Sequence, residues 1–155
     1  MLKYLLAALV IFTSSAQAAQ HREALGVEMP GTGSFKIGDA PDQSFSEFNF
    51  LSSNGISQYA VPTTSGSVGF AGKRDLQPSA TDYLLHVDRI VNVQPDLKVN
   101  TVPADGVCKM KSDETGMWVY AVDCSVTTEF GPATLSFKGN GERVKITTVP
   151  LPKKH

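Results

Sequence analysis

The sequence predicts an all-β domain, most simply an antiparallel β-sandwich of about eight strands, behind a cleavable N-terminal signal helix. From Ser57 onward, short apolar runs are separated by Gly, Pro, Asn and Asp, as in proteins built from many short strands. Residues 117–126 alternate apolar and polar side chains with a period of two, which indicates a strand with one buried face. A partly closed β-barrel has the same signature and is the alternative fold.

The first residues have the three parts of an export signal. Lys3 precedes an uninterrupted apolar run over residues 4–12, and a small polar segment then ends in Ala16-Gln17-Ala18. The apolar run is about half of the roughly 20 residues that span a bilayer, so it predicts a removable signal without stable membrane insertion. We expect cleavage near Ala18 and a periplasmic or secreted mature protein.

Four segments follow from this division of the chain. Residues 1–18 are the signal peptide, and residues 19–33, polar and Gly-rich, are expected to form a flexible lead-in. Residues 34–149 form a single β-rich domain, since a mature chain of about 137 residues suffices for one core. Residues 150–155 form a tail. Within the lead-in, Leu25, Val27 and Met29 alternate as a short edge strand would.

Two segments carry aromatic residues whose spacing leaves their structure open. In residues 39–51, Phe45 and Phe48 have the spacing of a helix, whereas Phe48 and Phe50 have that of a strand; we favour the strand. In residues 83–93, a strand would place on one face a set of apolar side chains interrupted by Arg89. That set consists of Tyr83, Leu85, Val87, Val91 and Val93.

An aromatic pair lies at the start of the alternating segment 117–126. Trp118 and Tyr120 could stack on a sugar ring. Because they continue the apolar face of that segment, we favour a place in the core. The rest of this face is Val122, Cys124 and Val126.

Asn140-Gly141 lies between two apolar-alternating runs, the strongest short-range hairpin signal, because a type I′ turn needs positive φ at both central residues. A two-residue loop there pairs Phe137 with Val144 and Leu135 with Ile146. All four side chains would then share the buried face.

Cys108 and Cys124 are the two cysteines of the chain, and in an exported protein they predict a disulfide. The bond closes a loop of about 17 residues and should stabilise the fold by roughly 3 kcal/mol. A tight hairpin centred on residues 113–115 would hold the two cysteines too far apart. Either the loop runs from about Ser112 to Val119, or the bond joins strands that are not partners.

Composition disfavours several classes of partner. The formal net charge is −1, falling to −2 without Lys3, and basic residues form no stripe that could neutralise nucleic-acid phosphates. Acidic residues are equally dispersed, which argues against a calcium site with several carboxylates. We expect no cofactor and no bound metal.

His86 and Asp88 are the best candidates for chemistry, since residues two apart on a strand project from one face. Such a pair could bind zinc or transfer protons, but zinc needs at least three protein ligands. The other histidines, His21 and His155, lie near the ends of the chain. We therefore interpret the pair as part of a solvated polar face.

Three functions remain compatible with these observations. The first, which we favour, is a binding or protein-interaction module that recognises a protein or a small envelope ligand through loops or a sheet edge. The second is an envelope hydrolase built around His86. The third is a structural or assembly subunit of the envelope.

Export itself is testable. We expect N-terminal sequencing of protein recovered from the export compartment to begin at Ala19, within one residue, because Ala16 and Ala18 satisfy the small-residue positions of the cleavage site. Recovery of material that still carries Lys3 would contradict the signal peptide.

Overall fold

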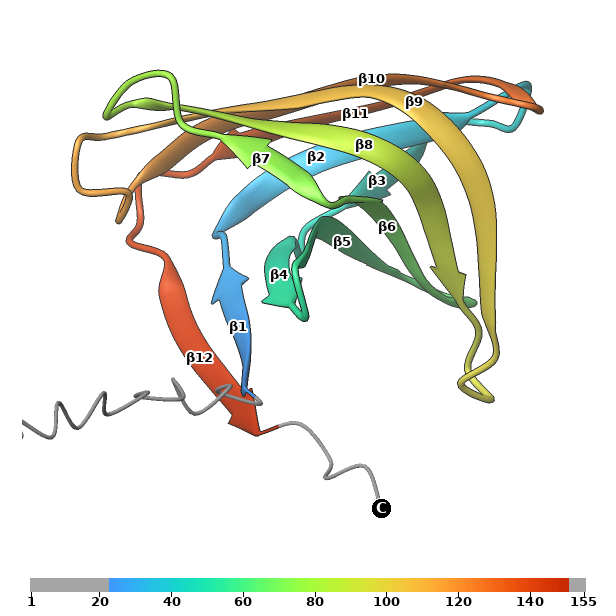
Figure 1. Cartoon of the computed structure of the whole chain (residues 1–155), viewed down its shortest axis with the longest axis horizontal. Coiled ribbons are helices and arrows are strands. Elements are labelled where there is room, and N and C mark those ends of the chain that lie inside the picture. Colours follow the sequence, from blue (N-terminus) through green and yellow to red (C-terminus); the bar gives the residue numbers. More distant parts are fainter. Residues whose placement is uncertain (1–22, 151–155) are drawn as a thin grey trace, which may run out of the picture.

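The computed structural model describes residues 23–150, and the predicted signal helix lies outside them. The described part is all-β, with no helix, and its strands form one antiparallel sheet (Figure 1). The strands are β1 (Glu23–Glu28), β2 (Gly31–Ile37), β3 (Gln43–Phe45), β4 (Asn49–Ser53), β5 (Ile56–Thr63), β6 (Gly66–Gly72), β7 (Arg74–Leu76), β8 (Asp82–Val93), β9 (Val99–Ser112), β10 (Val119–Thr128), β11 (Gly131–Gly139) and β12 (Lys145–Pro150).

The sheet curls on itself into a half-barrel, so the predicted sandwich of two stacked sheets is wrong and the barrel-like alternative is supported (Figure 1). Its strand order is β12-β1-β4-β5-β6-β8-β9-β10-β11-β2-β3, with β7 paired to β8. The chain passes between the two ends of this order three times: between β1 and β2, between β3 and β4, and between β11 and β12. Asn140 N donates to Pro30 O over 3.1 Å, which joins the first and the last of these crossings. Each strand along the order is hydrogen-bonded to its neighbours, so the strands form one sheet.

A ladder of aromatic rings fills the half-barrel. It joins Phe45 of β3, Phe48 of the β3–β4 connection and Phe137 of β11 to Tyr59 of β5. The shortest step is between Phe48 and Phe137, whose ring centroids are 4.5 Å apart. The ladder thus spans the interior from one wall of the curled sheet to the other. It ends at Phe35 on β2 and, through Phe50, at Tyr83 on β8.

Glycines in β2 make room for this ladder. A Cβ atom at Gly31 would overlap the ring of Phe137, and one at Gly33 would overlap the ring of Phe45. The aromatic rings cover the backbone where these glycines carry no side chain, a known way of packing glycine-containing strands. The Gly-rich segment that we expected to be a flexible lead-in therefore supplies, from residue 23 onward, β1 and the start of β2.

The disulfide is confirmed. Cys108 and Cys124 are directly opposite partners on β9 and β10 and are bonded on the buried face. The pairing of Ser112 with Val119 confirms the longer of the loops considered. Asp113 organises this loop by accepting the backbone N–H of Trp118 over 3.0 Å.

The hairpin predicted at Asn140-Gly141 is wrong. β11 pairs with β10 and β2, β12 pairs with β1, and these two residues form a corner between β11 and β12. The other Asn-Gly pair, Asn54-Gly55, makes the two-residue hairpin instead, with φ of 52° and 74° and Ser53 opposite Ile56. Leu135 and Phe137 are buried as predicted, but Ile146 is 58% exposed.

Two β-bulges move side chains that simple alternation placed in the core. In β10, the register shifts between Val119 and Ala121, and Val119 becomes buried while Trp118 and Tyr120 are 36% and 56% exposed. The predicted core position of this aromatic pair is therefore wrong. In β8, a shift between Val87 and Arg89 turns Ile90 inward, so Arg89 does not interrupt the buried face.

Buried and exposed side chains alternate along β11, so one substitution on each face can be compared. Phe137→Ala should lower the free energy of unfolding by about 3–5 kcal/mol, because the ring is 2% exposed and stacks on Phe48. Its exposed neighbour Ser136 bonds only Asp123 among the described side chains, so Ser136→Ala should cost well under about 1 kcal/mol. Denaturant titration measures both unfolding free energies. Equal losses would contradict the burial of Phe137 and the exposure of Ser136 on β11.

Candidate functional site

His86 and Asp88 both lie on the exposed side of β8, but they form no joint site. His86 Nδ1 lies 3.0 Å from the backbone oxygen of Gly106. Asp88 is bonded to the neighbouring Arg89, and this hydrogen bond holds the pKa of the Asp88 carboxyl below its usual value. The bulge that starts at Asp88 separates the two side chains in register.

The other side chains that could support catalysis or metal binding form no site among the described residues. Cys108 and Cys124 are joined and offer no thiol. Within residues 23–150, no group of three or more His, Cys, Asp and Glu side chains is placed to hold a metal ion. The same residues contain no helix that could cross a membrane.

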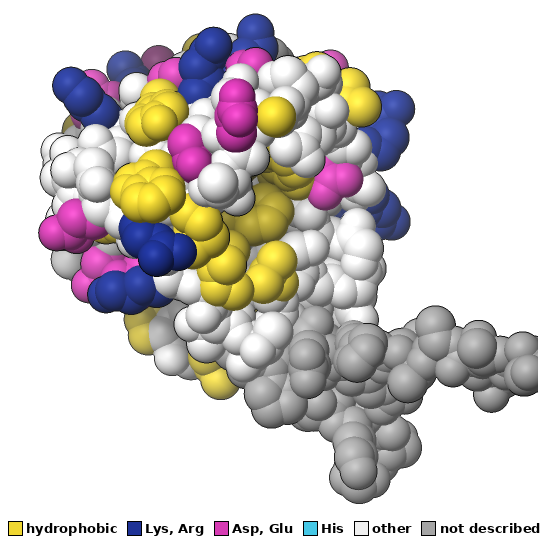
Figure 2. Space-filling view, turned by 90° about the vertical axis from the view of Figure 1, so that its left-hand side faces the viewer, with side chains coloured by type: hydrophobic (Ala, Val, Ile, Leu, Met, Phe, Trp, Pro, Cys, Tyr) yellow, Lys and Arg dark blue, Asp and Glu magenta, His cyan; other side chains and the backbone are white. Residues whose placement is uncertain are grey.

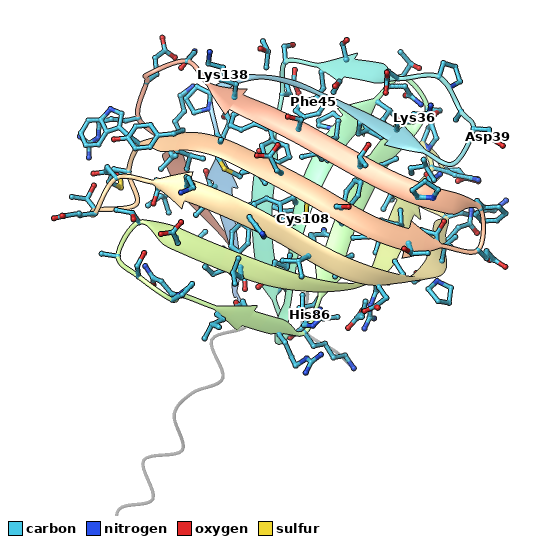
Figure 3. All side chains as sticks on the ribbon, turned by 90° about the horizontal axis from the view of Figure 1, so that it is seen from above. Lys36, Asp39, Phe45, His86, Cys108 and Lys138 are labelled. Atoms are coloured by element: carbon cyan, nitrogen blue, oxygen red, sulfur yellow. A yellow bond between two sulfur atoms is a disulfide. The ribbon has the colours of Figure 1, made fainter. Side chains whose placement is uncertain are left out.

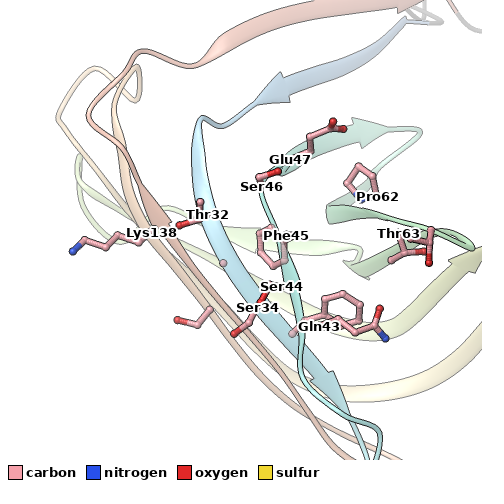
Figure 4. A pocket seen from close by; sticks show the side chains of 14 residues that line it. Thr32, Ser34, Gln43, Ser44, Phe45, Ser46, Glu47, Pro62, Thr63 and Lys138 are labelled. Carbon is pink, nitrogen blue, oxygen red and sulfur yellow. The ribbon is translucent and has the colours of Figure 1, made fainter.

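A hollow lies where the curled sheet remains open, between β3 and the β5–β6 hairpin (Figure 4). It is an open groove of about 1020 Å³. Figure 3 shows Lys138, which borders the groove, across the sheet from His86. The lining is rich in hydroxyl groups from β2, β3, β11 and the hairpin: Thr32, Ser34, Ser44, Ser46, Thr63, Thr64 and Ser136.

The groove follows a sheet edge that has no partner strand among the described residues. β3 is the last strand of the order and pairs only with β2. Gly38 N donates to Pro132 O over 2.9 Å, in register with the pairing of β2 to β11. Backbone groups alternate between the two edges of a strand, so the even residues of β2 bond β11 and the odd residues bond β3.

This alternation determines which groups of β3 are free. The hydrogen-bonded pairs are Gly33 with Phe45 and Phe35 with Gln43. The backbone N–H and C=O of Ser44, which lies between them, must therefore point away from β2 into the groove. Such a donor and acceptor can pair with the backbone of an added extended chain.

The opposite wall is the tip of the β5–β6 hairpin, residues 62–64. β4 pairs with β5 only up to Ala60, so residues 61–63 of β5 have no partner on that side. Pro62 has no backbone N–H and cannot donate to a new strand. The groove therefore offers backbone hydrogen bonds mainly from the β3 side and hydroxyl and apolar contacts from the hairpin.

Two charged side chains also border the groove. Glu47 follows β3, and Lys138 lies on β11. Both are exposed, and neither forms an ion pair among the described residues. An extended ligand can therefore meet one charge of each sign, on a surface that is otherwise neutral.

Sequence reasoning did not find this groove. Residues 43–47 and 62–64 come together only because the sheet curls, and pairing between distant strands has no local signal. The sequence favoured a strand within residues 39–51 but carried no signal that this strand lies at a sheet edge. No family model, curated protein sequence or solved structure matches this chain.

Proposed function

We propose that this chain is an exported, non-enzymatic binding module that recognises an extended segment of a partner protein at the free edge of β3. The observation that carries the proposal is the unpaired backbone of Ser44 beside a large groove. Strand addition at an exposed edge is a recurrent mode of peptide recognition, in which backbone hydrogen bonds supply affinity and side-chain contacts supply specificity.

The open form of the groove and its position along β3 support an extended segment rather than a compact ligand. The groove is open, is bounded by β3 on one side and residues 62–64 on the other, and leads over the outer face of β2 and β11. Its hydroxyl groups suit the polar backbone and side chains of a peptide. The predicted signal peptide and the disulfide support action in the periplasm or outside the cell.

The two other functions, an envelope hydrolase and an assembly subunit, stay predictions, and each has a direct test. Loss of a hydrolytic activity in a folded His86→Ala variant would support the hydrolase. Concentration-dependent oligomers in size-exclusion chromatography would support an assembly subunit.

Strand addition predicts a specific response to proline at position 44. Ser44→Pro removes the outward N–H together with the hydroxyl, and should be tolerated in the fold, because proline occurs on edge strands with that position facing solvent. Ser44→Ala removes the hydroxyl and keeps the N–H. Peptides selected from a random display library against the mature chain should bind Ser44→Pro at least about tenfold more weakly, equivalent to about 1.4 kcal/mol, and Ser44→Ala nearly as well as the parent.

Calorimetry and hydrogen exchange together test this prediction. Calorimetry of one selected peptide measures both variants, and their denaturation midpoints show that both are folded. In hydrogen exchange of the parent protein, the Ser44 amide should become protected when the peptide binds. Selected peptides that bind Ser44→Pro as tightly as Ser44→Ala, or that leave the Ser44 amide unprotected, would refute strand addition at β3.

A further inference from the structure

An exposed carboxylate lies on the inner side of the sheet, at the other end of β5 from the groove. Asp75 of β7 is the register partner of the buried Leu85, so its side chain lies on the inner side of the sheet. Its Oδ2 atom accepts the hydroxyl of Tyr83 over 2.7 Å and lies 3.3 Å from Ser57 Oγ. Ser57 Oγ is also 3.3 Å from Ser52 Oγ. These contacts gather polar groups from four strands: β4, β5, β7 and β8.

No described cation forms an ion pair with this cluster. Asp75 takes part in none of the ion pairs within residues 23–150. Burial is the main reason that the pKa of Tyr83 is raised, and the hydrogen bond to Asp75 raises it further. The Tyr83 hydroxyl therefore stays protonated and donates to Asp75. Close by, the fully buried hydroxyl of Tyr59 has no hydrogen-bond partner among residues 23–150, and burial is the main cause that raises its pKa. The cluster therefore has a negative charge and an unused hydroxyl.

An apolar wall adjoins the cluster. Val27 of β1 is the register partner of both Phe50 on β4 and Ile146 on β12, so the three side chains share one face of the sheet. Leu25 lies two residues along on the same face and is 38% exposed, while Ile146 is 58% exposed. The rings of Phe50 and Tyr83 meet edge to face at 5.8 Å and connect the wall to Asp75. Figure 2 shows hydrophobic side chains gathered around a recess on this side of the molecule.

We infer that this open end of the half-barrel is a second binding site, separate from the β3 groove, and that it takes a cationic amphiphile. The ammonium or guanidinium head group would pair with Asp75 and lie near the ring of Tyr83, as cations do in aromatic sites. The apolar chain would cover Leu25, Val27 and Ile146, whose exposure to water costs free energy in proportion to their apolar area. The proposal thus accounts for both the unpaired charge and the uncovered apolar wall.

A series of octyl compounds tests the site on the mature chain. Octylammonium, the neutral octyl glucoside and the anion octanoate carry the same chain and differ in head group. Calorimetry below their micelle concentrations should show octylammonium binding at least about tenfold more tightly than the other two. Asp75→Asn should remove this preference. Asp105→Asn makes the same charge change at another exposed position, on β9 and away from the cluster, and should alter the affinity less than about twofold.

A separate variant tests the apolar wall. Ile146→Ser should weaken the binding of octylammonium severalfold and reduce the affinity difference between octylammonium and butylammonium. Denaturation midpoints establish that all variants are folded. Equal affinity for the three octyl compounds, or equal effects of Asp75→Asn and Asp105→Asn, would overturn the proposal. In that case Asp75 serves as an inward-pointing charge that protects the free edge of β7 from strand addition.

Discussion

The stacking of Phe48 on Phe137 is the contact on which the rest of the structure depends. Phe48 belongs to the β3–β4 connection and Phe137 to β11, so this contact joins the two walls of the curled sheet. No described strand pairs β3 with β5 at the open side, where the barrel would otherwise close. The half-barrel is therefore closed by side-chain packing in its interior and not by a continuous ring of backbone hydrogen bonds.

This mode of closure explains why binding surfaces remain. A fully closed barrel has no edges, whereas a sheet closed by packing keeps its terminal strands unpaired. β3 is left beside the groove, and β7 and the wall formed by β1 and β12 are left at the open end. The disulfide between Cys108 and Cys124 lies in the middle of the long β8–β11 wall, where it joins neighbouring strands.

Features that depend on residues close together in the sequence could be predicted. The all-β class follows from alternation and turn residues, and the disulfide follows from two cysteines in an exported chain. Strand spacing left the loop from Ser112 to Val119 as one of two alternatives, and the structure has that loop. The Asn-Gly rule holds for Asn54-Gly55, yet Asn140-Gly141 has the same flanking pattern and forms a corner. A local signal reports that the chain turns, but not which strand it then meets.

The remaining errors have one physical origin, which is pairing between distant segments. The exposed positions of Trp118 and Tyr120 depend on a bulge against β9, and strict alternation cannot reveal a bulge. The groove depends on the curl that brings residues 43–47 to residues 62–64. His86 and Asp88 lie on the exposed side of β8, as expected for a polar strand face, and each has its own partner.

A double-mutant cycle on Phe48 and Phe137 tests most directly whether ring packing holds the walls together. Unfolding free energies of Phe48→Leu, Phe137→Leu and the double variant give the coupling between the two rings. If their stacking joins the walls, the coupling should be about 0.5–1.5 kcal/mol beyond the loss of buried area. Effects that add to within about 0.3 kcal/mol would show that the rings act independently, and would contradict closure of the half-barrel by this contact.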